Sequence, residues 1–309
     1  MKQKTKVVWA VDPFEKDSKV LAHAAAILKG LSSRLNAVIY PVYVLSDGLL
    51  GVTVGSDALT NTYKELAMAK LEHKLGTRGM AKLENPLVLV CAPSSPSIAA
   101  DALDRYAIQK GADFIFVSSH GRGGLRRAFL GSFAETLVLY AQTPVMISGP
   151  RSQVSRTFDR VLFPTDFGAP SLKALGKALA VTKQLGARLT ILHAVPNSIE
   201  LYASAGATLL GGGFIPVRTF AENHAGQQRK LAQDWVKKAQ AKGVKTDAIV
   251  DVANQSAAFS TLEWARKKKA GLVVMSSQSS GFSAAVLGSV GREIARSASC
   301  PVLFLRSKS

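Results

Sequence analysis

Short, continuously apolar runs alternate along this chain with longer segments whose apolar residues recur every three or four positions. The run Lys6–Val11 is typical of a buried strand, and the segment 18–31 that follows it has helical spacing. By the same criteria, the first half contains further strands at 37–44, 87–91, 114–118 and 145–147 and helices at 61–75, 98–110 and 132–141.

The second half shows the same alternation. Its predicted strands are 160–164, 188–194, 247–250, 272–276 and 302–305, and its predicted helices are 171–185, 220–242, 257–269 and 290–297. Apolar strands separated by amphipathic helices indicate a parallel sheet covered on both faces. The pattern predicts an α/β fold of two tandem, doubly wound, five-stranded domains, in which ligands bind at the carboxyl ends of the strands.

The two halves also repeat in sequence. Four blocks match in the same order, and the offset between partners is 154 to 158 residues: 7–14 with 161–168, 114–119 with 272–277, 130–132 with 287–289, and 143–147 with 300–304. A repeat in one order indicates a duplicated domain. We expect domains at residues 1–150 and 156–309, joined by a polar stretch.

Composition adds charge to this picture. The chain has 309 residues, with 39 Lys and Arg against 21 Asp and Glu, a net charge of +18. Such a balance favours polyanions, including nucleotides and nucleic acid, although a solvated basic surface explains it equally well. The longest apolar run is about seven residues, far short of a membrane span. Without a signal peptide pattern, and with only two cysteines in apolar surroundings, the sequence predicts a cytoplasmic protein that does not enter membranes.

The segment 117–132 carries the strongest sign of chemistry. A strand ends at Ser118, a glycine-rich loop with Gly121 and Arg122 follows, and a helix begins near Gly131 and Ser132. Glycines let backbone N–H groups approach an anion, and a helix N-terminus attracts negative charge. An ordinary strand-to-helix loop with a serine cap is the alternative.

These motifs resemble the universal stress protein family. Its nucleotide-binding members carry Gly, two residues, Gly, nine residues and then Gly-Ser or Gly-Thr; here the corresponding positions are Ser118, Gly121, Gly131 and Ser132. The family's Pro-Thr-Asp-Phe run recurs at 164–167, and its Leu-His-Val run resembles residues 192–194 and, more loosely, 40–42.

The resemblance implies a site for ATP or a related adenine nucleotide, with or without magnesium. In half one it assigns Asp12 and Val42 to the adenosine end, and Ser118, Gly121, Arg122, Gly131 and Ser132 to the phosphates. In half two it assigns Asp166 and Ala194, then Ser276, Ser279, Gly288 and Ser289. Half two departs further from the motif, because serines replace both early glycines and the loop is one residue shorter. We therefore expect binding mainly in half one.

The expected role is that of a stress-response sensor or switch. No acid–base dyad, metal cluster or P-loop motif is evident in the sequence, so we predict no catalytic residues and no protein-held metal. A slow ATP hydrolase and a nucleotide-free protein that uses its basic surface remain alternatives. Family members often pair through their last strands, which implies an internal pseudo-dimer of 145–147 with 302–305; further pairing of two chains stays open.

Overall fold

Ten strands and the helices between them are described in the computed structural model over residues 4–46, 57–76, 82–91, 95–118, 131–154, 157–195, 217–252, 256–277 and 287–306. Half one comprises β1 (Lys6–Ala10), α1 (Ser18–Leu35), β2 (Val38–Ser46), α2 (Asp57–Gly76), β3 (Leu87–Cys91), α3 (Pro96–Lys110), β4 (Phe114–Ser118), α4 (Ser132–Tyr140) and β5 (Val145–Ser148). Half two comprises β6 (Arg160–Pro164), α5 (Ala169–Leu185), β7 (Arg188–Ala194), α7 (Val217–Ala241), β8 (Thr246–Asp251), α8 (Ala257–Lys267), β9 (Leu272–Ser276), α9 (Ser289–Ser297) and β10 (Val302–Leu305).

The strands form one sheet in the order β3-β2-β1-β4-β5-β10-β9-β6-β7-β8. Neighbouring strands run parallel within each half, which confirms the predicted doubly wound fold. The two halves meet through β5 and β10, which pair antiparallel. The predicted pairing of the last strands is thus present, and it joins two five-stranded units into one sheet.

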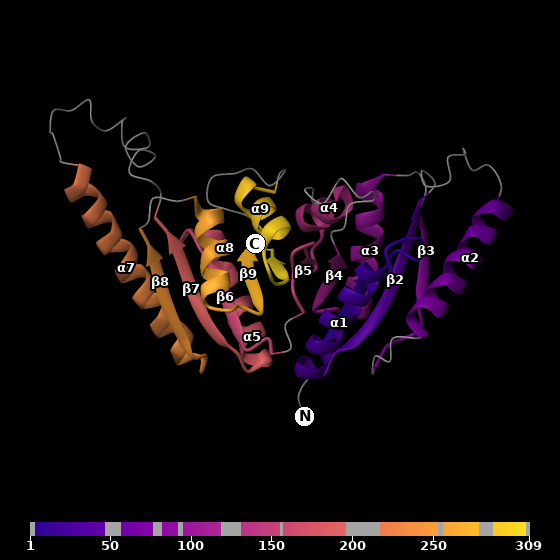
Figure 1. Ribbon diagram of the computed structural model, residues 1–309, viewed down its shortest axis with the longest axis horizontal. Helices are drawn as coiled ribbons and strands as arrows, with labels where there is room; N and C mark the ends of the chain where they lie inside the picture. Colours follow the sequence, from indigo (N-terminus) through magenta and orange to yellow (C-terminus); the bar gives the residue numbers. More distant parts are fainter. Residues whose placement is uncertain are drawn as a thin grey trace.

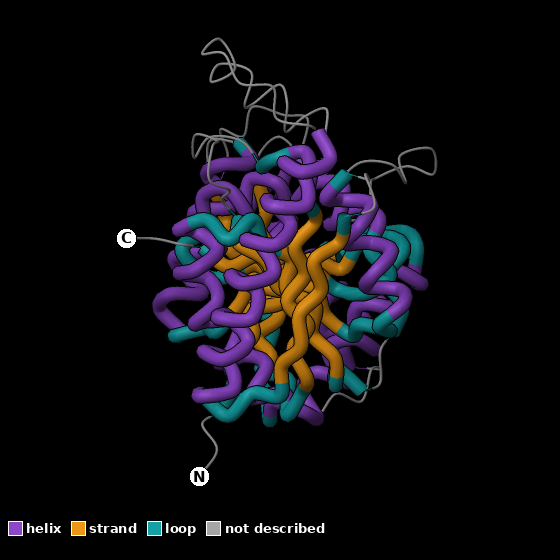
Figure 2. The backbone as a smooth tube through the Cα atoms, turned by 90° about the vertical axis from the view of Figure 1, so that its left-hand side faces the viewer, coloured by secondary structure: helices purple, strands orange, loops and turns teal. Residues whose placement is uncertain are grey.

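Helices cover both faces of this sheet (Figures 1 and 2). One hydrophobic cluster packs α1, α2, α5 and α7 against one face, and a second packs α3, α4, α8 and α9 against the other. Each cluster contains residues of both halves, so the apolar layers continue across the β5–β10 junction. Among the described helices, none is both long and apolar enough to cross a membrane.

Helix ends follow local sequence. Asp17 caps α1 by accepting a hydrogen bond from the backbone N–H of Lys19, and α1 ends at Asn36 in the left-handed conformation. The helix therefore runs four residues beyond the predicted end at Leu31, because Leu35 returns to the apolar face and is buried. Ser95 and Ser256 cap α3 and α8 in the same way as Asp17.

Candidate functional site

Each parallel half reverses its strand order beside its first strand, between β1 and β4 in half one and between β6 and β9 in half two. Ligands of doubly wound sheets bind at the carboxyl edge at such switch points. Because the chain enters α4 from the end of β4, and enters α9 from the end of β9, the N-termini of both helices lie at this edge.

Asp12 follows β1 at this edge in half one. Its Oδ1 accepts a hydrogen bond of 2.9 Å from the backbone N–H of Phe14, which holds the turn that leads toward α1. Asp166 follows β6 at the equivalent place, and its Oδ1 accepts from the N–H of Gly168 (2.9 Å) and the hydroxyl of Ser171 (2.7 Å). Both predicted carboxylates thus shape the first turn of their half and remain partly or largely exposed.

The second strands show that Val42 and Ala194 do not occupy equivalent positions. Val11 donates to the carbonyl of Val42 (2.9 Å), whereas Thr165, its counterpart, donates to the carbonyl of Leu192 (2.8 Å). Val42 therefore corresponds to Leu192, and the counterpart of Ala194 is Val44. The match of 40–42 to 192–194 was displaced by two residues, because in an apolar strand a shift of two keeps every side chain on its own face.

The predicted phosphate end of half one combines an uncapped helix with buried hydroxyls. Gly131 is the N-cap of α4, and no described side chain caps the helix; Ser132 at its first position is exposed. Ser118 ends β4 beside Ser148, which ends β5, and the two are partners in the sheet. Both hydroxyl oxygens are buried, and within the described residues neither has a hydrogen-bond partner. Such groups are rare unless water or a ligand satisfies them.

The predicted phosphate end of half two differs at one of these positions. Gly288 is the N-cap of α9 without a side-chain hydrogen bond among the described residues, and Ser289 is exposed, as in half one. Ser276 ends β9, but its sheet partner on β10 is Leu305, whose side chain belongs to the hydrophobic core. Gly121, Arg122 and Ser279 lie outside the described residues.

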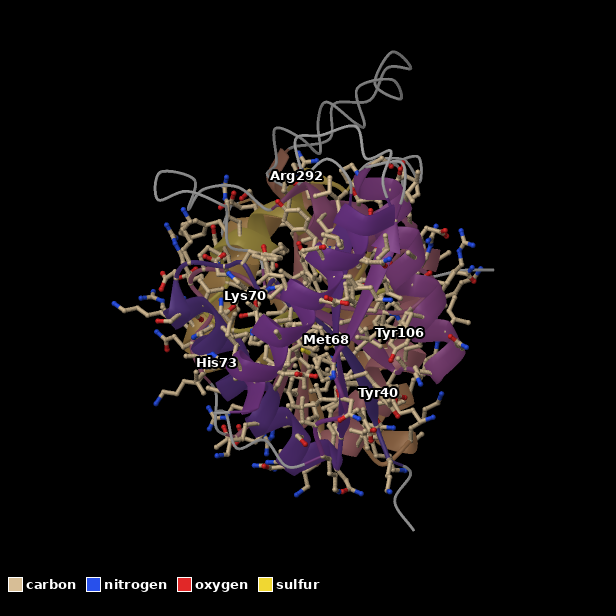
Figure 3. The ribbon with its side chains drawn as sticks, turned by 90° about the vertical axis from the view of Figure 1, so that its right-hand side faces the viewer. Tyr40, Met68, Lys70, His73, Tyr106 and Arg292 are labelled. Carbon is tan, nitrogen blue, oxygen red and sulfur yellow. The ribbon has the colours of Figure 1, made fainter. Side chains whose placement is uncertain are left out.

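Aromatic side chains pack beside the turn that follows the first strand of each half, a region called its first-turn side. In half two, the ring of Phe167 lies 4.8 Å from that of His193 and 5.0 Å from that of Trp235, and Nδ1 of His193 is 2.8 Å from the carbonyl oxygen of Thr165. In half one, Phe14 and Tyr43 meet edge to face at 5.7 Å, and the ammonium of Lys70 on α2 lies over the ring of Phe14. Lys70 is labelled in Figure 3.

Ser148 and the aromatic cluster were missed in the sequence. Ser148 interrupts the apolar run of β5 at its last residue, and Leu305 at the matching place shows no such change, so aligning the two halves at that residue would have revealed it. Trp235 lies within a long helical pattern, and such a pattern does not indicate which loop the helix will pack against.

Burial shifts the pKa of His23, Tyr106 and Cys300. Burial raises the pKa of the Cys300 thiol to about 12, which keeps it protonated and unreactive. Burial also lowers the pKa of His23 on α1, against a smaller raising effect of its backbone contact with Ser152. Over the described ranges, no group of three or more His, Cys, Asp or Glu side chains is placed to hold a metal ion.

A model of the family described as "Universal stress protein family" matches residues 4–148 and, a second time, residues 157–306. The chain belongs to the universal stress protein family. The two matches correspond to the two halves of the sheet, so the duplicated unit is one universal stress protein domain.

Similar proteins carry the same name. Universal stress protein YxiE of Bacillus subtilis is 31% identical over 153 residues, which are 48% of this chain and 99% of that protein. A universal stress protein of Archaeoglobus fulgidus has a crystal structure that covers 97% of this chain and 96% of its own, with a TM-score of 0.61 and 18% identity. Another universal stress protein, solved in complex with cAMP, is 20% identical and covers 49% of this chain and 99% of its own, with a TM-score of 0.33.

Proposed function

We propose that this universal stress protein binds ATP or a related adenine nucleotide, mainly in half one, and acts as a cytoplasmic sensor or switch in the stress response. The observation that carries the proposal is the N-terminus of α4. Its N-cap is a glycine without a side-chain cap among the described residues, and the nearby strand β4 ends in a buried hydroxyl that lacks a partner there. Both features suit an oxygen-rich, anionic ligand, which would accept hydrogen bonds from the helix N-terminus and from the hydroxyl.

The residues divide into two groups along the carboxyl edge. The backbone N–H groups at the start of α4, with the hydroxyls of Ser132 and Ser118, would hold phosphate oxygens. Asp12 would face the adenosine end together with the strand-end backbone at Val42 or at Val44, the counterpart of Ala194. Gly121 and Arg122 belong to the proposed phosphate loop on the strength of the family motif.

Half two offers a weaker version of the same site in this proposal. Asp166, Ala194, Ser276, Ser279, Gly288 and Ser289 occupy the corresponding positions. The first-turn carboxylate of Asp166 is held by the hydroxyl of Ser171 as well as by a backbone N–H, and Leu305 replaces the second strand-end hydroxyl. Among the described residues, half two therefore has one strand-end hydroxyl fewer for a phosphate.

Gly131→Asp tests the proposal without weakening the fold. Among the described residues, an added Cβ at Gly131 meets nothing within 4 Å, and aspartate is a preferred N-cap, so the variant should be at least as stable as the wild type. Its carboxylate would occupy the N–H groups of α4 and repel phosphate, which should weaken nucleotide affinity by about tenfold or more.

Gly288→Asp is the matched control, because an added Cβ there also meets none of the described residues within 4 Å. Isothermal titration of Mg-ATP and of AMP into wild type and both variants, with thermal melting of each, gives the comparison. We expect Gly131→Asp to lose most of the affinity and Gly288→Asp to retain it. If neither nucleotide gives binding heat with the wild-type chain, the proposal is refuted. A loss of affinity confined to Gly288→Asp would assign the main site to half two.

A further inference from the structure

The junction between the halves has an internal two-fold symmetry. In the antiparallel pair, Val302 faces Ile147, Leu303 faces Met146 and Phe304 faces Val145. Equivalent residues of β5 and β10 are 157 apart in sequence, so the register is symmetric about Met146 and Leu303. The helices α4 and α9 obey the same offset from N-cap to C-cap and lie side by side across the junction (Figure 1).

One pair of equivalent positions carries opposite charges. Glu135 on α4 and Arg292 on α9 are 157 residues apart, each in the first turn or just after it. Across the junction, Nε of Arg292 lies 3.0 Å from Oε1 of Glu135, and the side chains are 45% and 27% exposed. Arg292 lies near the top of the molecule in Figure 3. Two copies of half one would bring glutamate to glutamate here, and two copies of half two would bring arginine to arginine.

A second pair of equivalent positions differs in size. Arg306 follows β10, and its Nη1 donates to the carbonyls of Tyr140 (2.5 Å) and Ala141 (2.9 Å) at the end of α4. The position equivalent to Arg306 is Gly149, which follows β5 and packs against the last turn of α9. A Cβ added at Gly149 would collide with the backbone oxygen of Ala295. One side of the junction thus needs a long cation, and the other admits no side chain.

We infer that this junction is built to pair half one with half two and to reject the pairing of like halves. Two copies of half one would set Glu135 against Glu135 and leave the carbonyls at the end of α4 without arginine. Two copies of half two would set Arg292 against Arg292 and place Arg306 where even a Cβ does not fit. The partner that either edge strand fits is therefore the opposite half of this chain, and both edges are closed against other sheets.

The inference can be tested in the full chain, because single substitutions recreate each like pairing. Arg292→Glu produces glutamate against glutamate, Glu135→Arg produces arginine against arginine, and the double variant restores opposite charges in exchanged places. We expect each single variant to lower the melting temperature by on the order of 2 °C at low salt, with less effect at high salt. The double variant should melt close to the wild type.

Controls separate the junction from net charge. Arg105→Glu and Asp101→Arg make the same changes of net charge on α3, away from the junction, at an exposed ion pair one helical turn apart. Combining Arg105→Glu with Glu135→Arg restores the net charge but leaves arginine against Arg292, so this combination should not recover the wild-type melting temperature. A double variant that melts as low as the sum of its two single variants would overturn the charge part of the inference.

Gly149→Arg recreates the second like pairing, and Gly149→Ala is the milder version in case the arginine variant fails to fold. We expect Gly149→Ala to lower the melting temperature more than either charge reversal, because the obstructing atom belongs to the backbone of α9. Arg306→Gly should lower it as well, through lost hydrogen bonds to the end of α4. Wild-type melting of Gly149→Ala would overturn the steric part.

Discussion

Half one and half two share their strand order and the start positions of their helices. They differ at the strand ends beside the proposed phosphate site. Ser118 and Ser148 place two buried hydroxyls side by side in half one, whereas Ser276 has Leu305 beside it in half two. The apolar core has been kept in both copies, because losing it would unfold the domain. The polar carboxyl edge was free to diverge, so function is read from that edge rather than from the fold.

The first-turn sides differ as well. In half two, Phe167 adopts a positive φ of 56° and packs against His193 and Trp235. A left-handed conformation is unfavourable for a phenylalanine, so the surrounding rings must hold it in place. Half one has a looser pair, Phe14 with Tyr43, under a lysine of α2. Half two therefore packs three rings around its first turn, where half one has two rings and a lysine.

The largest expected effect comes from the packing that distinguishes half two. Trp235→Ala removes a buried ring that contacts Phe163 and Phe167, and it should lower the free energy of unfolding by about 3–5 kcal/mol. Urea denaturation measures this loss. Phe259→Ala, at a side chain 53% exposed on α8, is the matched control and should change stability by about 0.5 kcal/mol or less. Equal losses of unfolding free energy in the two variants would contradict the account of a tightly packed first-turn side.

A smaller loss should follow from a buried carboxylate in half one. Asp104 on α3 accepts hydrogen bonds from the backbone N–H groups of Gln142 (2.7 Å) and Thr143 (3.0 Å), between α4 and β5. Asp104→Ala leaves both N–H groups buried and should cost about 2–3 kcal/mol of unfolding free energy. Asp101→Ala on the exposed side of the same helix should cost about 0.5 kcal/mol or less. An unchanged free energy of unfolding in Asp104→Ala would show that half one does not need these two hydrogen bonds to position α4.

The hydroxyl pair should matter for binding rather than for folding. Ser118→Ala should weaken nucleotide affinity by about tenfold, since a hydrogen bond to a charged phosphate is lost. Neither Ser118→Ala nor Ser148→Ala should lower the melting temperature, because the two hydroxyls have no partner among the described residues to lose. Ser276→Ala in half two serves as control in the same titration. Lower stability without a change in affinity would make the pair structural and erase this difference between the halves.

The smallest effect concerns pH and the α1 side of half one. Burial lowers the pKa of His23 from 6.5, so its imidazole is neutral in the folded chain while the unfolded chain binds the proton more readily. Stability should therefore fall as the pH drops below 6.5 toward the lowered value, and it should be fully regained above 6.5. His23→Gln should flatten this part of a denaturation profile measured against pH, whereas Lys19→Gln on the same helix should not. An unchanged slope in His23→Gln would contradict the assignment.

The strands, the helices between them and the duplication were predictable because apolar runs and their matched blocks are visible in local sequence. The register of the second strands was not predictable, since placing Val44 where Val42 stands changes neither the face of the sheet nor the hydrophobicity of the residue. The end of α1 was misplaced because Ser32, Ser33 and Arg34 look like a loop, although they lie on the solvent side of a turn that brings Leu35 back to the core. Glu135 and Arg292 are unremarkable separately, and their meaning appears only when the symmetric register brings equivalent positions together.

The central claim is that one fold carries two unequal sites. The number of nucleotides bound by each wild-type chain tests this claim most directly. Calorimetric titration of Mg-ATP into the full chain gives this number together with the affinity. We predict a single dominant site per chain that Gly131→Asp removes and Gly288→Asp leaves. Two sites of equal affinity, each removed only by the substitution in its own half, would contradict the account.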